Sequence, residues 1–242
     1  MFHLTIKNNK YLHMKSIYLS LICLLLVSNC KSDQQKTSKE NHKEEFKELS
    51  IAEKIANAHG FEQWQNVSEV KFTFQVNRDS VQGKGRSWTW NPKENKVKMS
   101  TSETPIAYVR RKIDSSYIST DKAFINDKFW LLVPFQLVWD STATISESKF
   151  VTSPIYNKNL KLITLTYPPK GGYTPGDAYD IYYDDDYIIR EWAYRKGNSE
   201  EPSLSTTFEN YNDYNGIKIA TDHKQEGGNW NLNFTNITVT LK

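Results

Sequence analysis

The sequence predicts a mainly β domain with short helices, in which about nine to eleven antiparallel strands form one long, curved sheet. From Val67 onward, apolar residues alternate with polar ones, which is the pattern of strands with one buried face. Turn-forming pairs such as Asn91-Pro92 and Gly227-Gly228 separate the alternating runs. No segment after Asn66 has the pattern of a crossover helix long enough for a βαβ unit, so the sheet should be antiparallel.

The chain begins with the pattern of an export segment. Met14-Lys15-Ser16 precedes an apolar run from Ile17 to Val27. This run is shorter than the roughly 20 apolar residues that a membrane-spanning helix needs. A positive residue before a short apolar run is typical of a signal peptide. We therefore expect residues 1–29 to be a signal peptide, with Met14 as an alternative start that would shorten its polar N-terminal part.

Cys30 lies directly after this segment. Val27-Ser28-Asn29-Cys30 resembles the lipobox of bacterial lipoproteins, in which the cysteine receives a diacylglycerol and becomes the mature N-terminus. Asn29 departs from that pattern, since Gly, Ala or Ser is usual at its position. The alternatives are an ordinary secretory signal with an incidental cysteine, or an uncleaved anchor. We expect lipidation of Cys30 and a place in the bacterial cell envelope, at the outer membrane, on its periplasmic or its surface face.

Charge and cysteine content exclude several function classes. The chain has 31 basic and 28 acidic residues, and three basic residues, Lys7, Lys10 and Lys15, lie in the expected signal peptide. The mature chain then has no formal net charge, and no basic block with interleaved aromatics indicates nucleic-acid binding. Cys30 would be its only cysteine, which excludes a disulfide within the chain and a cysteine-based metal site. We expect no metal and no cofactor.

The first helix is expected over residues 51–58. Residues 30–47 should form the lipidated cysteine and a flexible tether, because they are rich in Lys, Glu, Gln and Ser. The domain then occupies residues 48–242. Ser50 and Glu53 have the spacing of a capping box. Gly60 suits the left-handed position that follows a helix.

The strands follow from their alternating apolar residues. The clearest is the run Val70, Phe72, Phe74 and Val76. Near Thr235, the apolar residues of the last strand change from one alternate set to the other. This change predicts a β-bulge or a bend in a strongly curved sheet.

One segment inside the β region has no alternation. Phe129 to Trp139 is apolar at almost every position, and Pro134 would remove a hydrogen-bond donor from a central strand. We interpret it as a short helix or loop that plugs the concave side of the sheet. The alternative is a core strand that ends at Pro134.

These features together resemble the LolA/LolB-like superfamily of envelope lipoprotein carriers, which includes the outer-membrane lipoprotein-sorting proteins. The resemblance covers most of the domain and rests on the helix that ends at His59-Gly60, the strands 179–184 and 187–190 around an acidic turn, and the segment 208–219. Ala220 stands where the family usually has proline. The resemblance implies an unclosed half-barrel, covered by one N-terminal helix and the helical plug, whose concave face accommodates acyl chains. Relatives without carrier activity share this shape, so the fold alone does not settle the function.

Noncovalent binding of a lipid or another hydrophobic ligand is the leading hypothesis for the function. A concave, aromatic-lined cavity is the usual form of such a site. Each candidate side chain has the alternative role of simply filling the core. The candidates for the lining are Phe72, Phe74, Trp88, Trp90, Trp130, Phe135 and Trp192. The expected partners are a membrane, through the N-terminal lipid, and the hydrophobic ligand, and we expect a monomer.

Other functions are alternatives to this hypothesis. The Tyr- and Asp-rich region 171–187 is a candidate surface for a glycan or a protein partner, or else a rigid connection with half-buried tyrosines. Asp184-Asp185-Asp186 lacks the alternating ligands and the glycine of an EF-hand loop, which favours a hairpin turn over a calcium site. Catalysis is not expected, because the chain has no nucleophile elbow, no His-Glu-x-x-His motif and no phosphate-binding loop.

Overall fold

The computed structural model describes residues 48–79, 81–100 and 104–242. The predicted signal peptide, Cys30 and the predicted tether lie outside these residues. The described residues all belong to one compact unit, which spans residues 47–242. No helix in the described ranges combines the length and the apolar character needed to cross a membrane.

The first helix starts where its capping box predicts. The backbone N–H of Glu53 donates to Ser50 Oγ (3.2 Å), and the N–H of Ser50 donates to the Glu53 carboxylate (2.7 Å). These bonds satisfy backbone donors that have no partner within the helix. Helix α1 spans Ile51–Ala58, and Gly60 follows it with φ 91°. The 3₁₀ helix η1 (Phe61–Asn66) then leads into the first strand.

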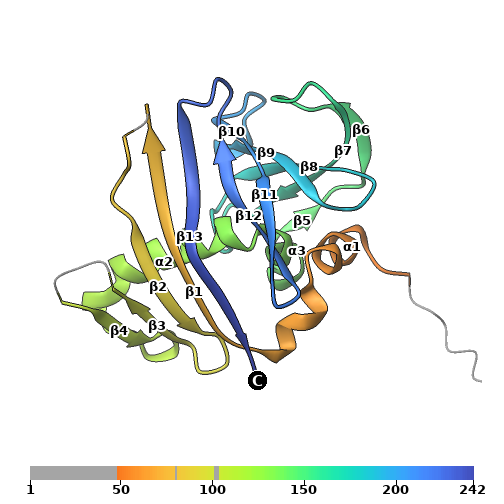
Figure 1. Cartoon of the computed structure of the whole chain (residues 1–242). Helices are drawn as coiled ribbons and strands as arrows, with labels where there is room; N and C mark the ends of the chain where they lie inside the picture. The colour runs from red at the N-terminus through yellow and green to blue at the C-terminus, as the bar shows by residue number, and fades with distance from the viewer. Residues whose placement is uncertain (1–47, 80, 101–103) are drawn as a thin grey trace, which may run out of the picture. The chain divides into compact units, whose positions relative to one another are not determined.

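A seven-stranded antiparallel sheet, which we call sheet A, forms one side of the domain (Figure 1). The strand nearest the C-terminus has the predicted irregularity: its step of three residues from Thr235 to Thr238 lies opposite a step of two residues, from Lys71 to Thr73. Asn236 takes φ 51° within this bulge. The spatial order of the sheet is β11 (Glu209–Tyr214), β12 (Ile217–Lys224), β13 (Trp230–Leu241), β1 (Val67–Arg78), β2 (Arg86–Asn91), β3 (Lys96–Met99) and β4 (Ile106–Val109).

Six further strands form a second antiparallel sheet, sheet B. They run in the order β10 (Leu204–Thr207), β9 (Ile189–Arg195), β8 (Ala178–Tyr183), β7 (Asn159–Thr166) and β5 (Thr144–Ile145), and β6 (Lys149–Thr152) also pairs with β7. The mainly antiparallel β prediction is thus confirmed, and neither sheet closes into a barrel. The expected single meander is divided between two sheets, and the described residues contain 13 strands.

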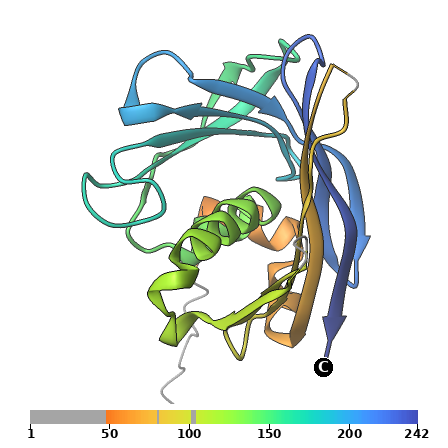
Figure 2. The same ribbon diagram turned by 90° about the vertical axis from the view of Figure 1, so that its left-hand side faces the viewer.

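Two consecutive helices lie between the sheets, as Figure 2 shows for the green helix α2. α2 spans Ile118–Leu131 and α3 spans Val133–Trp139, with Pro134 in the first turn of α3. The predicted helical plug over residues 129–139 is therefore confirmed, although α2 begins well before the predicted segment. Short 3₁₀ helices, η2 (Arg110–Lys112) and η3 (Ser115–Tyr117), connect β4 to α2, and η4 (Lys196–Asn198) follows β9.

The core occupies the space between the two sheets. Side chains of sheet A, sheet B and all three α-helices belong to one cluster of buried residues. Among the largest fully buried side chains are Trp88, Trp192, Phe129 and Phe135. The concave faces of both sheets are thus covered largely by the protein's own side chains.

Candidate functional site

Helix α2 is attached to sheet A by a buried ion pair. Arg86 of β2 donates from Nε to Asp127 Oδ2 (2.8 Å) and from Nη2 to Oδ1 (2.6 Å). Trp88 Nε1 also donates to Asp127 Oδ2 (2.8 Å). The Asp127 side chain is fully buried, whereas that of Arg86 remains 38% exposed. A buried carboxylate needs such donors, because leaving it unpaired would cost several kcal/mol.

Two further contacts hold the same helix. Arg110 Nε donates to Asp121 Oδ1 (2.7 Å), at the end of β4. The Lys128 ammonium lies 5.3 Å from the ring centroid of Trp139 and 5.8 Å from that of Trp90. Burial lowers the pKa of Lys128 to about 8. These contacts fix the face of α2 that points toward sheet A.

The opposite face of α2, toward sheet B, borders a cavity of about 260 Å³, which we call the aromatic pocket. Asn126 and Trp130 of α2 form one wall, and β8, β9 and β10 supply the other. The loop between β7 and β8 closes one end. The lining consists of Asn126, Trp130, Tyr173, Thr174, Tyr179, Trp192, Tyr194 and Leu204.

The rings of the aromatic pocket contact one another directly. Tyr179 stacks on Trp192, with centroids 5.2 Å apart and planes at 30°. Trp130 meets Trp192 edge-on at 4.3 Å and 65°. Such offset and edge-to-face arrangements are the favoured geometries of aromatic pairs. The pocket walls therefore have a defined shape.

Most polar groups of the aromatic pocket already have partners. Tyr173 Oη donates to Asn126 Oδ1 (3.0 Å), and Tyr194 Oη donates to Asp177 Oδ2 (2.8 Å). The Tyr179 hydroxyl shares a hydrogen bond of 2.9 Å with Thr174 Oγ1. Trp192 Nε1 is the exception, since this buried group makes no hydrogen bond to any described residue.

The aromatic pocket is electrically neutral. None of its lining side chains carries a formal charge at neutral pH. Burial raises the pKa of Tyr173 and of Tyr179 above the ordinary phenol value. Burial also raises the pKa of Tyr194 to about 12. The pocket thus suits an uncharged ligand better than a carboxylate or a phosphate.

The structure brings two of the seven predicted lining residues, Trp130 and Trp192, into the aromatic pocket. The other five, Phe72, Phe74, Trp88, Trp90 and Phe135, are buried in the common core and are not among the side chains that line it. Trp88, for example, is held by its bond to Asp127.

Sequence reasoning did not assign Tyr173, Tyr179 and Tyr194 to this pocket. Tyr173 and Tyr179 belong to the region 171–187, where their density was interpreted as a surface for a glycan or a protein. Tyr194 follows Trp192 by two residues on β9, so both side chains lie on the same face of that strand. This alternation was the available signal.

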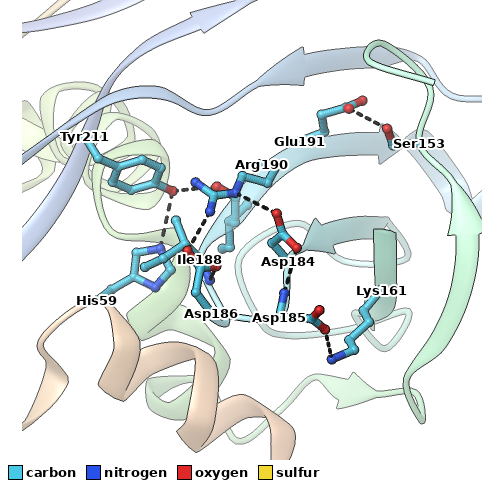
Figure 3. Close-up of polar contacts among 11 residues, drawn as sticks. His59, Ser153, Lys161, Asp184, Asp185, Asp186, Ile188, Arg190, Glu191 and Tyr211 are labelled. Atoms are coloured by element: carbon cyan, nitrogen blue, oxygen red, sulfur yellow. Dashed lines mark hydrogen bonds and ion pairs between the residues drawn. The ribbon is translucent and has the colours of Figure 1, made fainter. Parts of the chain in front are cut away.

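A larger cavity of about 500 Å³, the polar cavity, lies where β9 meets β11. Arg190 reaches into this region from β9, and Figure 3 shows its pairing with the acidic turn between β8 and β9. Its Nη2 lies 2.6 Å from Asp186, and its Nε lies 3.7 Å from Asp184. The lining consists of Tyr156, Lys158, Leu160, Asp184, Arg190, Phe208, Glu209, Asn210 and Tyr211.

The acidic residues 184–186 form a hairpin turn in which each carboxylate lies beside a basic side chain. Asp185 pairs with Lys161 (2.6 Å), in addition to the two contacts of Arg190. In the part of the chain that the structure describes, no group of three or more His, Cys, Asp or Glu residues is placed to hold a metal ion.

A buried histidine connects α1 to both sheets beside the polar cavity (Figure 3). His59 Nδ1 lies 2.8 Å from the Ile55 carbonyl, and Nε2 lies 3.3 Å from Tyr211 Oη. Tyr211 Oη in turn donates to the Ile189 carbonyl of β9 (2.9 Å). Burial lowers the pKa of His59 to about 4, so this imidazole is neutral at physiological pH. These bonds support the fold and leave His59 no room for a ligand.

Comparison with known proteins adds likenesses of fold. No protein-family model matches the sequence, and no curated protein matches it. A LolA superfamily protein from Nitrosomonas europaea is 8% identical, and the match covers 79% of this chain and 94% of that one with a TM-score of 0.45. A DUF1329 family protein from Desulfovibrio piger is 11% identical, with coverages of 78% and 91% and a TM-score of 0.43.

Proposed function

We propose that this protein binds a small hydrophobic ligand noncovalently in the aromatic pocket. The observation that carries the proposal is the pocket itself: an uncharged, ring-lined cavity of about 260 Å³ between α2 and sheet B. Ligand sites of this kind are concave, mostly apolar and equipped with a few polar groups. The hydroxyls and the amide of the lining supply such groups.

The size of the aromatic pocket limits the ligand. Pockets for drug-sized molecules usually measure roughly 300–1,000 Å³. A cavity of about 260 Å³ suits one small molecule, or one end of a longer lipid. A complete acyl chain buried between the sheets would have to displace α2, and the Arg86–Asp127 pair opposes that movement.

We also propose that the protein acts in the bacterial envelope, anchored to a membrane through a lipid on Cys30. A protein held in this way is a local receiver or handler of its ligand and does not shuttle between membranes. The lipobox-like residues before Cys30 and the export segment support this part of the proposal.

The alternative function, binding of a glycan or a protein through residues 171–187, has less support. Tyr179, Tyr182 and Tyr183 are 3%, 9% and 1% exposed, so they offer little surface. Tyr173 stacks on Phe129 with centroids 3.9 Å apart. The tyrosines of this region serve mainly as packing groups.

Titration with an uncharged hydrophobic fluorophore, N-phenyl-1-naphthylamine, tests the proposed function. Residues 47–242, which contain the whole described core, would be purified and titrated with the probe, and native mass spectrometry would detect ligands that co-purify. We expect probe binding, reduced at least tenfold by Leu204→Trp, which fills the pocket. Leu49→Trp is the matched control, since Leu49 is 46% exposed and lies outside the pocket.

An empty protein that binds no probe would overturn the proposal. A glycan-array signal that Tyr173→Ala abolishes would favour the alternative function instead.

A further inference from the structure

We infer that the β4 end of sheet A presents a basic surface that lies against an anionic phospholipid bilayer. This basic surface consists of the outer faces of β3 and β4, the turn between β2 and β3, and η2 (Figure 1). The inference goes beyond the proposed function and requires neither the aromatic pocket nor a lipid on Cys30. The exposed basic side chains of the surface are Lys93, Lys96, Lys98, Arg111 and Lys112.

Basic residues outnumber acidic ones in this part of the chain. Residues 92–100 and 104–113 contain six basic residues, the five above and Arg110, and one acidic residue, Glu94. Glu94 pairs with Lys96 (2.6 Å), and Arg110 is paired within the fold. The remaining four basic side chains have no acidic partner among the described residues.

Strand pairing places lysines beside small apolar side chains on one face. Lys96 of β3 lies opposite Val109 of β4. Lys98 lies opposite Ala107. Val97, between the two lysines, is buried in the core, and alternate residues of a strand point to opposite faces. Lysines and small aliphatic side chains therefore share the outer face, where they border a hollow of about 310 Å³.

The turn between β2 and β3 brings η2 to the same surface. The backbone N–H of Arg110 donates to the Asn95 carbonyl (2.9 Å). Arg111 Nε lies 3.1 Å from the side-chain amide of Asn95. Lys93 belongs to this turn, and Lys112 belongs to η2. The unpaired positive charges thus gather at one corner of the sheet, and such a cluster attracts a surface of opposite charge.

The side chains between these charges favour a bilayer over a nucleic acid. Ala107 and Val109, of which Val109 is 36% exposed, suit the apolar boundary beneath lipid headgroups. A single-stranded nucleic acid needs exposed aromatic rings for its bases, whereas Tyr108 of β4 is only 7% exposed. The proposed lipid on Cys30 would also hold a bilayer at high local concentration.

Co-sedimentation with lipid vesicles tests the inference. Residues 47–242, which contain the whole described core and lack Cys30, would be mixed with vesicles of phosphatidylcholine alone or of equal parts phosphatidylcholine and phosphatidylglycerol. Each basic residue near an anionic surface strengthens binding about fivefold. We therefore expect at least about tenfold stronger binding to the anionic vesicles, and a loss of this preference as NaCl is added.

Two double variants separate the basic surface from the overall charge. Lys98→Gln with Arg111→Gln removes two unpaired charges from the surface, so binding to the anionic vesicles should weaken about 25-fold. Lys84→Gln with Lys149→Gln removes the same charge from exposed positions outside it, and should change binding less than about twofold. Both variants should still bind N-phenyl-1-naphthylamine, because none of these residues lines the aromatic pocket.

An environment-sensitive label identifies the face that meets the bilayer. Residues 47–242 contain no cysteine, so Ala107→Cys provides a single site for an NBD group on the basic surface. Phe150→Cys is the control, since Phe150 of β6 is 63% exposed and lies outside that surface. Anionic vesicles should shift the NBD emission to the blue for the label at Ala107→Cys alone.

Equal binding to the two kinds of vesicle, or equal losses in the two double variants, would overturn the inference. A blue shift only for the label at Phe150→Cys would assign the bilayer to another face and overturn it as well. Salt-sensitive binding to double-stranded DNA or to polyglutamate, without binding to vesicles, would replace the bilayer by another polyanion. These outcomes all leave the proposed ligand site standing, because the fluorophore titration reports on the aromatic pocket alone.

Discussion

Arg86 and Asp127 form a two-point ion pair that joins strand β2 to helix α2, with N–O distances of 2.8 and 2.6 Å. The two partners differ in burial, because the Asp127 side chain is fully buried while the Arg86 side chain is 38% exposed. Removing one or the other should therefore have unequal effects.

Arg86→Ala should be the more damaging change. It leaves the Asp127 carboxylate buried with only weaker donors, and removal of one partner of a buried pair typically costs about 3–5 kcal/mol. Asp127→Asn leaves Arg86 able to reach water, so a loss of about 1–3 kcal/mol is expected. Urea denaturation of residues 47–242 measures both values.

Lys96→Ala is the control for this pair. Its ion pair with Glu94 is exposed on both sides, at 59% and 60%, and pairs of this kind contribute roughly 0–1 kcal/mol. Equal losses for Arg86→Ala and Lys96→Ala would show that the buried pair does not hold α2.

The two histidines of residues 47–242 should make the protein less stable as the pH decreases. Burial lowers the pKa of His59 and of His223 to about 4. The unfolded chain, whose histidines have a pKa of about 6.5, therefore binds more protons between pH 6.5 and pH 4. Stability is fully present above that window and falls as the pH drops through it, by about 3 kcal/mol for each histidine.

An NMR titration of the imidazole signals checks this directly. Neither ring should take up a proton above about pH 5 in the folded protein. A ring that titrates near its unperturbed pKa of about 6.5 would contradict the burial argument.

Gly60→Ala should destabilise the contact between α1 and the β11–β12 hairpin. A Cβ atom at Gly60 would lie 1.8 Å from the Gly216 carbonyl oxygen, and Gly60 also has φ 91°. The loss should exceed about 2 kcal/mol, since steric overlap adds to the conformational strain. Denaturant unfolding would measure it.

Gly227→Ala measures the effect of the backbone strain alone, without steric overlap of the added Cβ atom. Gly227 has φ 80°, but an added Cβ would meet nothing within 4 Å. Its loss should stay near 1 kcal/mol. If both variants lose the same amount, the approach of Gly216 does not matter for stability.

Cys30→Ser should release the protein from the membrane. A serine cannot form the thioether to diacylglycerol, so the variant should move from the detergent phase to the aqueous phase in a Triton X-114 partition. Metabolic labelling with a fatty acid should mark only the unmodified protein. Labelled protein with serine at this position would exclude Cys30 as the anchor.

Local signals in the sequence predicted the local features of the fold. The capping box at Ser50 and Glu53 marks the observed start of α1, and the phase change near Thr235 marks the bulge at Asn236. The alternation of apolar residues identified the buried faces of the strands. It carries no information on which strand pairs with which, so the division into two sheets was not predicted.

The sequence did not predict the first part of α2, for a related reason. Asp127 is buried among Phe124, Phe129 and Trp130, which interrupts the apolar spacing of the helix. Its burial depends on Arg86 and Trp88, which lie 41 and 39 residues away in the chain. The same limit applies to the aromatic pocket, because only the fold brings Tyr173 and Trp192 to one cavity.

The free edges of the two sheets have a consequence for the protein at high local concentration. β11 carries Glu209 and Asp213, β4 is four residues long and is followed by Arg110–Lys112, and β6 begins at Lys149. Short or charged edges discourage another copy from adding its strand. Molecules crowded on one surface would therefore not build a fibre through β4, β6 or β11.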